Sequence, residues 1–235
     1  MSTAPAIVPA MSRRLLQRVL AASLASLCLA ASAPVFAAAS PDDRIELATE
    51  ALRDLLTDSP PPMSLLRETT CIAVLPRVIR AALGIGGRHG KGVMSCRREG
   101  GEWSPPVFLK MSGGSLGLQI GAEASDVVLL IVDPRSARSL LRSKFTIGAD
   151  AKAAAGPRSV GAEATTDARL DAEIYSYATS KGFFAGVSLG GAKLKLSRKL
   201  VSNYYPEQPL PEELLFGRAQ VRESPAVAAF REALP

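Results

Sequence analysis

Residues 71–96 read CIAVLPRVIRAALGIGGRHGKGVMSC, and the texture of the chain changes where they begin. The apolar and β-branched runs CIAVL and GVMSC at the two ends are typical of strands. Between them, GIGGRHGKG at residues 84–92 combines five glycines with Arg88, His89 and Lys91. Glycine-rich segments with a lysine often cradle phosphates. The pattern predicts two strands joined by a glycine-rich turn, which either faces an anion or serves only as a tight connection.

Short strands continue beyond this stretch. VFLKM, SLGLQIG and DVVLLIVD follow, with the turn-forming groups REGGE and MSGG between runs, and this spacing favours an antiparallel meander over βαβ units. DVVLLIVD is nearly continuous, as expected of a central strand that is covered on both faces. AEIYSYATS, FFAGVSLGG and AKLKL return to the strand pattern. Strict alternation in AKLKL predicts Lys193 and Lys195 in solvent and Leu194 and Leu196 in the core.

Helix signals lie toward both ends of the chain. Ser40, Pro41 and Asp43 form an N-cap, first-turn proline and capping-box pattern ahead of apolar residues at helical spacing, which predicts a helix over 40–58. A second helix is expected after Asp133, and PEELLFG and SPAVAAFREAL predict two more near the C-terminus. The expected fold is α+β, a curved antiparallel β-sheet or barrel-like core with flanking helices, in a single domain over residues 40–235.

The first forty residues have the layout of a secretory signal peptide. Three arginines precede the apolar run VLAASLASLCLAASA, which is too short for a comfortable membrane span of about 20 residues. We expect a signal peptide over residues 1–37, cleaved after Ala37 or Ala39, and export by the Sec or twin-arginine route to the periplasm or envelope. Losing the three arginines takes the formal net charge from +6 to +3, and a mildly basic chain fits contact with anionic surfaces.

Removal of the signal peptide leaves two cysteines, Cys71 and Cys96. An even count in an oxidising compartment favours a disulfide. If the strands of the two cysteines pair antiparallel, Cys71 and Cys96 lie opposite each other within bonding geometry. Two reduced core cysteines are the alternative. Cys28, within the signal peptide, follows the bulky Leu27 where a lipobox has a small residue, and its lipidation is left open.

The motifs of the chain disfavour several kinds of chemistry. A P-loop ends in Gly-Lys-Ser/Thr, but Gly90 and Lys91 are followed by Gly92, and the dinucleotide pattern GxGxxG fails at His89. His89 is the only histidine, so a histidine-rich metal site is excluded, and no GxSxG nucleophile elbow is present. Proteins that bind single-stranded nucleic acid combine basic residues with aromatic side chains on which the bases stack. The basic residues of this chain are not interleaved with aromatic residues in that way. We expect no enzyme activity, cofactor, metal, nucleotide or nucleic acid.

Four basic residues cluster in sequence around the glycine-rich segment: Arg77, Arg80, Arg88 and Lys91. Backbone amides of such a segment form a concave nest for anions, and each lysine or arginine near an anionic lipid surface contributes about 1 kcal/mol. These four residues are the predicted lipid headgroup contacts, with the amides assisting. The alternative is a solvated loop whose charges keep a sheet edge soluble.

Four blocks in order resemble the SYLF-domain family, whose exported bacterial branch is related to Ysc84-like actin regulators. The blocks are CIAVLPRVIRAALGIGGRHGKGVMSCR, GGSLGLQIGAEASDVVLLI, KFTIGADAKAAAGP and GFFAGVSLGGAKL, within about residues 65–216. The most specific pieces are the proline-ended first strand with its glycine-rich segment and the run Gly114, Ser115, Gly117, Gln119 and Gly121.

The resemblance implies lipid binding, with a preference for phosphorylated inositol lipids among eukaryotic members, some of which also bind actin and carry an SH3 domain. For an exported protein we leave actin out and predict non-catalytic binding of anionic phospholipid or a membrane surface. One alternative is a structural envelope protein that binds a protein partner through a sheet edge, and another is an unrecognised hydrolase. The N-terminal helix of eukaryotic members helps membrane association, but PDDRIELATEALRDLL is acidic on its polar face, which favours packing on the sheet.

Overall fold

A single long two-stranded ribbon organises the fold. In the computed structural model, which describes residues 40–141, 145–157, 172–180 and 182–235, β1 (Cys71–Cys96) and β2 (Val107–Ile131) pair antiparallel along nearly their whole lengths. The predicted strands CIAVL and GVMSC are therefore the two ends of one strand. The predicted signal peptide over residues 1–37 lies outside the described residues.

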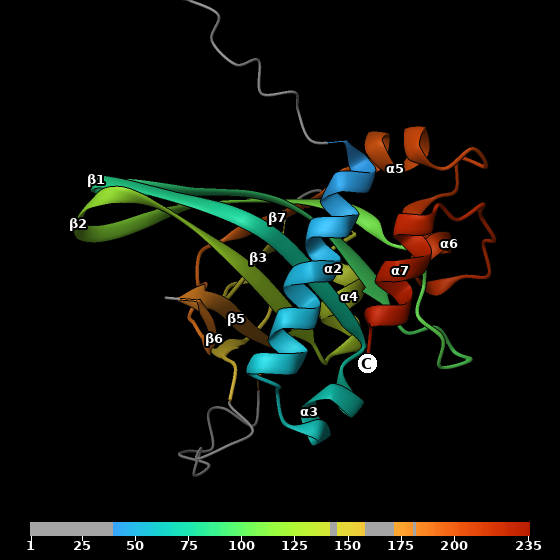
Figure 1. The fold of residues 1–235 in the computed structure, drawn as a ribbon, viewed down its shortest axis with the longest axis horizontal. Coiled ribbons are helices and arrows are strands. Elements are labelled where there is room, and N and C mark those ends of the chain that lie inside the picture. Colours follow the sequence, from blue (N-terminus) through green and yellow to red (C-terminus); the bar gives the residue numbers. More distant parts are fainter. Residues whose placement is uncertain (1–39, 142–144, 158–171, 181) are drawn as a thin grey trace, which may run out of the picture. The chain divides into compact units, whose positions relative to one another are not determined.

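The glycine-rich segment at residues 84–92 is part of β1, which corrects its prediction as a turn between two strands. MSGG, also predicted as a turn, lies inside β2 in the same way. Glycines of the two strands face one another here, as in the pairs Gly84–Gly117 and Gly87–Gly114. Because glycine permits bends that side chains would obstruct, the ribbon turns back on itself here with one register shift, between Leu83 and Gly84 (Figure 1). From the sequence alone the glycine run is interpreted as a turn, because the β2 residues that it pairs with lie elsewhere in the chain.

The two stretches of β1 on either side of the bend, here called the arms of the ribbon, pack against each other with their backbones in close contact. A Cβ on Gly92 would lie 2.0 Å from the carbonyl oxygen of Val74, and one on Gly90 would lie 2.7 Å from Cγ2 of Val78. The ends of β1 meet as well, although a straight strand of its length would span about 85 Å. The Cα atoms of Cys71 and Cys96 are 4.0 Å apart and their sulfurs are bonded, which confirms the predicted disulfide.

A bulge in β1 follows from the Pro76-Arg77 pair. The register shifts between Leu75 and Val78, because proline has no N–H to donate to the ladder. Arg77 has a positive φ of 51°, and its backbone N–H donates to Oδ1 of Asp126 at 2.8 Å. The bulge bends the ribbon arm and redirects the side chains that follow it.

The other strands extend the ribbon into a seven-stranded sheet in which β2 is central. β2 pairs with β5 (Ile174–Ser180) through its C-terminal end and with β7 (Lys193–Leu196) through its N-terminal end. β3 (Phe145–Thr146) lies beside β7, while β4 (Ala153–Ala155) and β6 (Phe183–Gly186) lie beside β5. β4 and β5 run parallel and the other pairs antiparallel. The α+β prediction is confirmed, as is the buried central position of DVVLLIVD.

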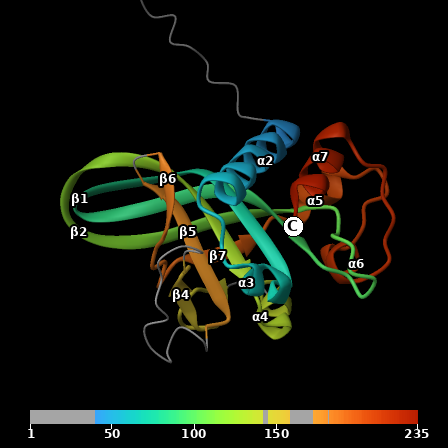
Figure 2. The ribbon, with the colours of Figure 1, turned by 60° about the horizontal axis from the view of Figure 1, so that its bottom comes forward.

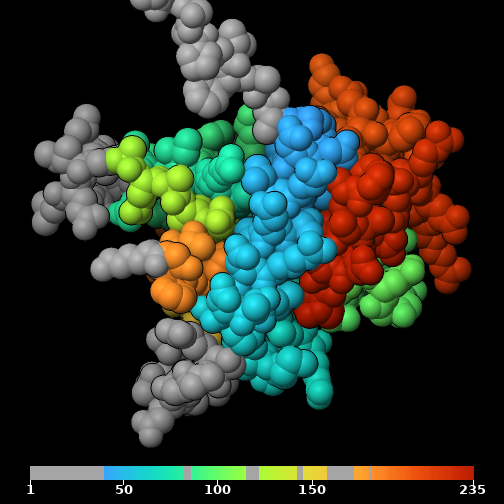
Figure 3. Space-filling view, in the orientation of Figure 1, coloured from blue at the N-terminus to red at the C-terminus, as the bar shows by residue number. Residues whose placement is uncertain are grey.

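Helix α2 (Pro41–Asp58) crosses one face of the sheet. The predicted capping box is present: the hydroxyl of Ser40 accepts from the backbone N–H of Asp43 at 3.0 Å, and the carboxylate of Asp43 accepts from the N–H of Ser40 at 2.8 Å. Ile45 and Leu52 are fully buried on its inner side. Figure 3 shows α2 lying directly alongside the C-terminal segment, so the two ends of the described domain cover the core together.

The remaining helices are short. The chain forms α3 (Met63–Glu68), α4 (Pro134–Ser139), α5 (Arg198–Tyr204), α6 (Pro211–Phe216) and α7 (Pro225–Ala233). α4, α6 and α7 confirm the predictions from Asp133, PEELLFG and SPAVAAFREAL. Figures 1 and 2 both place α5, α6 and α7 together at one end, with the bend of the ribbon at the other.

Candidate functional site

Three lysines lie side by side on adjacent strands of the sheet. Lys91 of β1 pairs with Lys110 of β2, and Lys110 pairs in turn with Lys195 of β7. All three are exposed. Directly opposed residues in antiparallel strands have Cβ atoms about 5 Å apart, and like charges at this distance destabilise the sheet. We call this group the lysine row.

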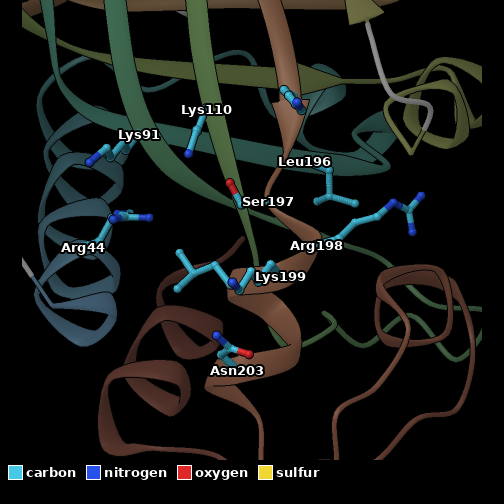
Figure 4. Close-up of a pocket in the computed structure, with 10 residues that line it drawn as sticks. Arg44, Lys91, Lys110, Leu196, Ser197, Arg198, Lys199 and Asn203 are labelled. Atoms are coloured by element: carbon cyan, nitrogen blue, oxygen red, sulfur yellow. The ribbon is translucent and has the colours of Figure 1, made fainter.

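A groove beside the lysine row gathers further positive charge (Figure 4). Its volume is about 740 Å³, within the range of ligand sites. Arg44 reaches it from α2, and Arg198 and Lys199 from the first turn of α5, where the helix dipole disfavours positive charge. Six of the ten described residues that line the groove are basic and none is acidic. The fold therefore concentrates cations at a cost in electrostatic repulsion.

Arg198 is the one basic residue of the groove that the described residues neutralise. It donates from Nη2 and Nη1 to the two carboxylate oxygens of Glu212, at 2.6 and 3.1 Å, and from Nη2 to the carbonyl of Leu141 at 2.6 Å. Among the described ion pairs, none includes Arg44 or a lysine of the groove. Arg198 is structural, while the other five cations are available to a ligand.

Arg44 is the least exposed of the basic residues that line the groove. Its guanidinium carbon lies 5.6 Å from the ring centroid of Phe108, and burial lowers its pKa. Its Nη1 is buried without a hydrogen-bond partner among the described residues. A partly dehydrated cation is costly unless it is paired, so a bound anion would relieve this cost.

The four headgroup contacts predicted from sequence do not converge. Lys91 lines the groove, whereas Arg80 and Arg88 line a second hollow of about 490 Å³. Lys91 and Arg88 are an odd number of positions apart in one strand, so their side chains leave on opposite faces. Arg77 is exposed at the bulge of β1. Neighbours in sequence are thus divided between two sites.

Sequence reasoning missed five of the six basic residues of the groove: Arg44, Lys110, Lys195, Arg198 and Lys199. The predicted exposure of Lys195 in AKLKL is confirmed, but no single segment shows that it is adjacent to Lys110. The sequence offered one signal for these residues: isolated lysines occur in several of the predicted strands. Their strand register, which joins segments far apart in the chain, was the missing information.

The other polar clusters of the described residues have structural explanations. The hydroxyls of Tyr204 and Ser224 both bond Oδ1 of Asp42, which ties α5 and the start of α7 to α2. Burial, reinforced by Asp42, raises the pKa of Tyr204, so this phenol stays protonated. His89 is exposed on β1. Across the described ranges, no group of three or more histidine, cysteine, aspartate or glutamate side chains is placed to hold a metal.

The chain resembles known proteins along most of the described domain. A family model, Ysc84: Las17-binding protein actin regulator, matches residues 112–235. SH3 domain-containing YSC84-like protein 1 of Xenopus laevis is 32% identical over 158 residues, covering 66% of this chain and 47% of that protein. Protein YSC84 of Saccharomyces cerevisiae is 30% identical over 163 residues, covering 68% and 35%. LAS seventeen-binding protein 3 of the same yeast is 31% identical over 169 residues, covering 71% and 36%.

The chain thus spans about a third to a half of the length of these curated relatives. One of these relatives is named for an SH3 domain and another for binding LAS seventeen.

Proposed function

The chain belongs to the Ysc84 family of Las17-binding actin regulators, and on that basis, together with the lysine row, we propose that it binds anionic phospholipid surfaces without catalysis. The observation that supports the proposal is the register of Lys91, Lys110 and Lys195 across three strands. A row of like charges that no described acid neutralises is explained by an anionic ligand that binds across it. Phosphate headgroups supply such charge at a membrane surface.

Five unpaired cations set the scale of the interaction. Arg44, Lys199 and the lysine row together contribute about 5 kcal/mol at about 1 kcal/mol each, which corresponds to a submillimolar affinity. Within the described residues, no helix is long and apolar enough to cross a bilayer. The proposed contact is electrostatic, and it weakens as salt shortens the Debye length to about 10 Å and below.

Co-sedimentation of the full chain with vesicles tests this proposal. Vesicles of phosphatidylcholine mixed with phosphatidylglycerol should bind the protein, and vesicles of phosphatidylcholine alone should not. The triple variant K91Q/K110Q/K195Q should lose about a hundredfold in affinity. K152Q is the matched control, because Lys152 is exposed and is not part of the groove lining. Equal binding by the triple variant and K152Q would remove the lysine row from the mechanism.

Of the four headgroup contacts predicted from the sequence, we propose that Lys91 contacts the headgroup together with the other unpaired cations of the groove. The headgroup role of Arg77, Arg80 and Arg88 stays a prediction. Charge reversal at Arg88 and at Lys91, tested separately in the vesicle assay, distinguishes the two faces of β1. We expect a large loss of vesicle binding for Lys91→Glu and a small one for Arg88→Glu.

Protein binding is a second candidate, because relatives carry the names Las17-binding and SH3 domain-containing. Phe183 at the start of β6 is 65% exposed on a strand paired with β5, and such an edge presents backbone groups to a partner. Recovery of one defined partner that F183S fails to bind, without vesicle binding, would favour this function over lipid binding.

We also propose that the protein is exported. The support is the basic and apolar layout of residues 1–37 and the disulfide of the described domain, which suits an oxidising compartment. N-terminal sequencing of the protein from an envelope fraction should begin at Ala38 or Ser40. A chain that starts at Met1 or Met11 in the cytosol would contradict export.

A further inference from the structure

A hollow that is separate from the groove opens beside the folded ribbon. Arg80 and Arg88 approach it from the two arms of β1, and Glu123 of β2 pairs with Arg80 in register. β5 and the segment after β6 complete the wall. The volume of about 490 Å³ is in the range of sites for small molecules. We call this space the inner hollow.

Charge in the inner hollow is not balanced by its own residues. Arg80 and Glu123 form a loose ion pair, with Nη1 and Oε1 3.7 Å apart and both side chains well exposed, so this pair contributes little. Arg88 has no ion-pair partner among the described residues, and its buried Nε has no hydrogen-bond partner there. Burial and the nearby charge of Arg80 both lower the pKa of Arg88. Two cations thus face one acid, and the more buried cation is unpaired.

The rest of the lining is apolar with a few hydroxyls. Its apolar members are Val78, Ala124, Val127, Ala178, Val187 and Leu189. Thr179 is among the hydroxyl residues, and its Oγ1 already accepts from the N–H of Asp126 at 2.7 Å. A site with an unpaired arginine against an apolar wall suits a ligand that has one anionic end and one hydrocarbon end.

We propose that the inner hollow binds a single-chain amphiphile with a carboxylate head, such as a medium-chain fatty acid. The planar guanidinium of Arg88 matches a carboxylate through paired charge-assisted hydrogen bonds. The valine and leucine side chains then cover the hydrocarbon chain. This site is independent of the proposed membrane contact, because Arg88 and Lys91 leave β1 on opposite faces.

Displacement of a fluorescent fatty acid from the full chain by dodecanoate, below its micelle concentration, tests the assignment. R88Q should weaken dodecanoate binding at least tenfold because the charge-assisted pair is lost, and R88K should recover part of the affinity. K91Q should bind dodecanoate like the natural chain. A melting curve for each variant shows whether it is folded.

A second variant tests the hollow without altering its charge. Ser188 is an exposed part of the lining, so S188W should block the hollow and abolish dodecanoate binding while leaving the melting temperature and vesicle binding unchanged. Undiminished dodecanoate binding by both R88Q and S188W would overturn the assignment. Equal displacement by dodecanol would show that the head is not recognised. Tighter binding of dodecyl phosphate would show that the site prefers a phosphate head to a carboxylate. If K91Q/K110Q/K195Q loses vesicle binding but keeps dodecanoate, the two sites are separate.

Discussion

Removal of the disulfide should destabilise the folded ribbon strongly. Cys71 and Cys96 are both fully buried, and their bond joins positions 25 residues apart in sequence. The double variant C71A/C96A leaves the backbone pairing of β1 with β2 available but frees the two ends of β1 in the unfolded chain. The perturbation therefore acts mainly on the entropy of the unfolded state.

The magnitude follows from the length of the closed loop. A cross-link around about 26 residues removes conformational entropy worth about 3.5 kcal/mol at 25 °C. In a chain of this size, 1 kcal/mol shifts the melting temperature by about 2–4 °C. We expect C71A/C96A to melt about 7–14 °C below the oxidised natural chain, with a further small loss because two buried sulfurs are missing.

Urea and thermal unfolding, followed by circular dichroism, measure the loss, and the reduced natural chain is the control because it has the same sulfurs without the bond. Cys28 is the third cysteine of the full chain. The denatured oxidised full chain should therefore react with a thiol reagent once, and the reduced chain three times. A loss of less than about 1 kcal/mol in C71A/C96A would refute the loop-closure reasoning, and three reactive thiols without reductant would refute the disulfide itself.

Three further predictions concern packing, capping and pH. Gly92→Ala should cost about 3 kcal/mol by overpacking, whereas Gly114→Ala, where an added Cβ meets nothing within 4 Å, should leave the urea midpoint nearly unchanged; equal midpoints would contradict the close packing of the ribbon arms. Ser40→Ala should lose about 1 kcal/mol with the capping box, and an unchanged midpoint would show that the cap adds nothing. Arg198 lowers the pKa of Glu212, so this carboxylate stabilises the fold above its ordinary pKa of 4.5 and loses that contribution as pH falls through the lowered folded-state pKa. The melting temperatures of E212Q and the natural chain should therefore converge in acid, and a constant difference would refute the linkage.

Local patterns predicted individual elements well. Ser40, Pro41 and Asp43 located the start of α2 because capping is an interaction between residues three positions apart. The alternation in AKLKL assigned its side chains to the correct faces because successive strand residues point in opposite directions. The run of strand patterns between helix signals at both ends of the chain predicted the α+β class. These predictions depend on contacts within a few residues.

Long-range pairing explains what was predicted wrongly or missed. The glycines at residues 84–92 are interpreted as a turn when read alone, but paired with the glycines of β2 they form a bend in a continuous ribbon. The four basic residues near this segment form a cluster in sequence, yet Lys91 lines the groove and Arg88 lines the inner hollow. Arg88 and Lys91 are close in sequence, but they are three positions apart in one strand, so their side chains leave it on opposite faces.

The amino-acid order alone determines the cap of α2 and the alternation of exposed and buried side chains in β7. It also identifies Cys71 and Cys96 as candidates for a disulfide and fixes the positive net charge of the chain. The tertiary structure determines that Lys91, Lys110 and Lys195 form one row, and that Arg80 and Arg88 face the same hollow. The reason is that hydrogen-bond register joins strands from distant parts of the chain, and electrostatic repulsion between side chains depends on their separation in space rather than in sequence.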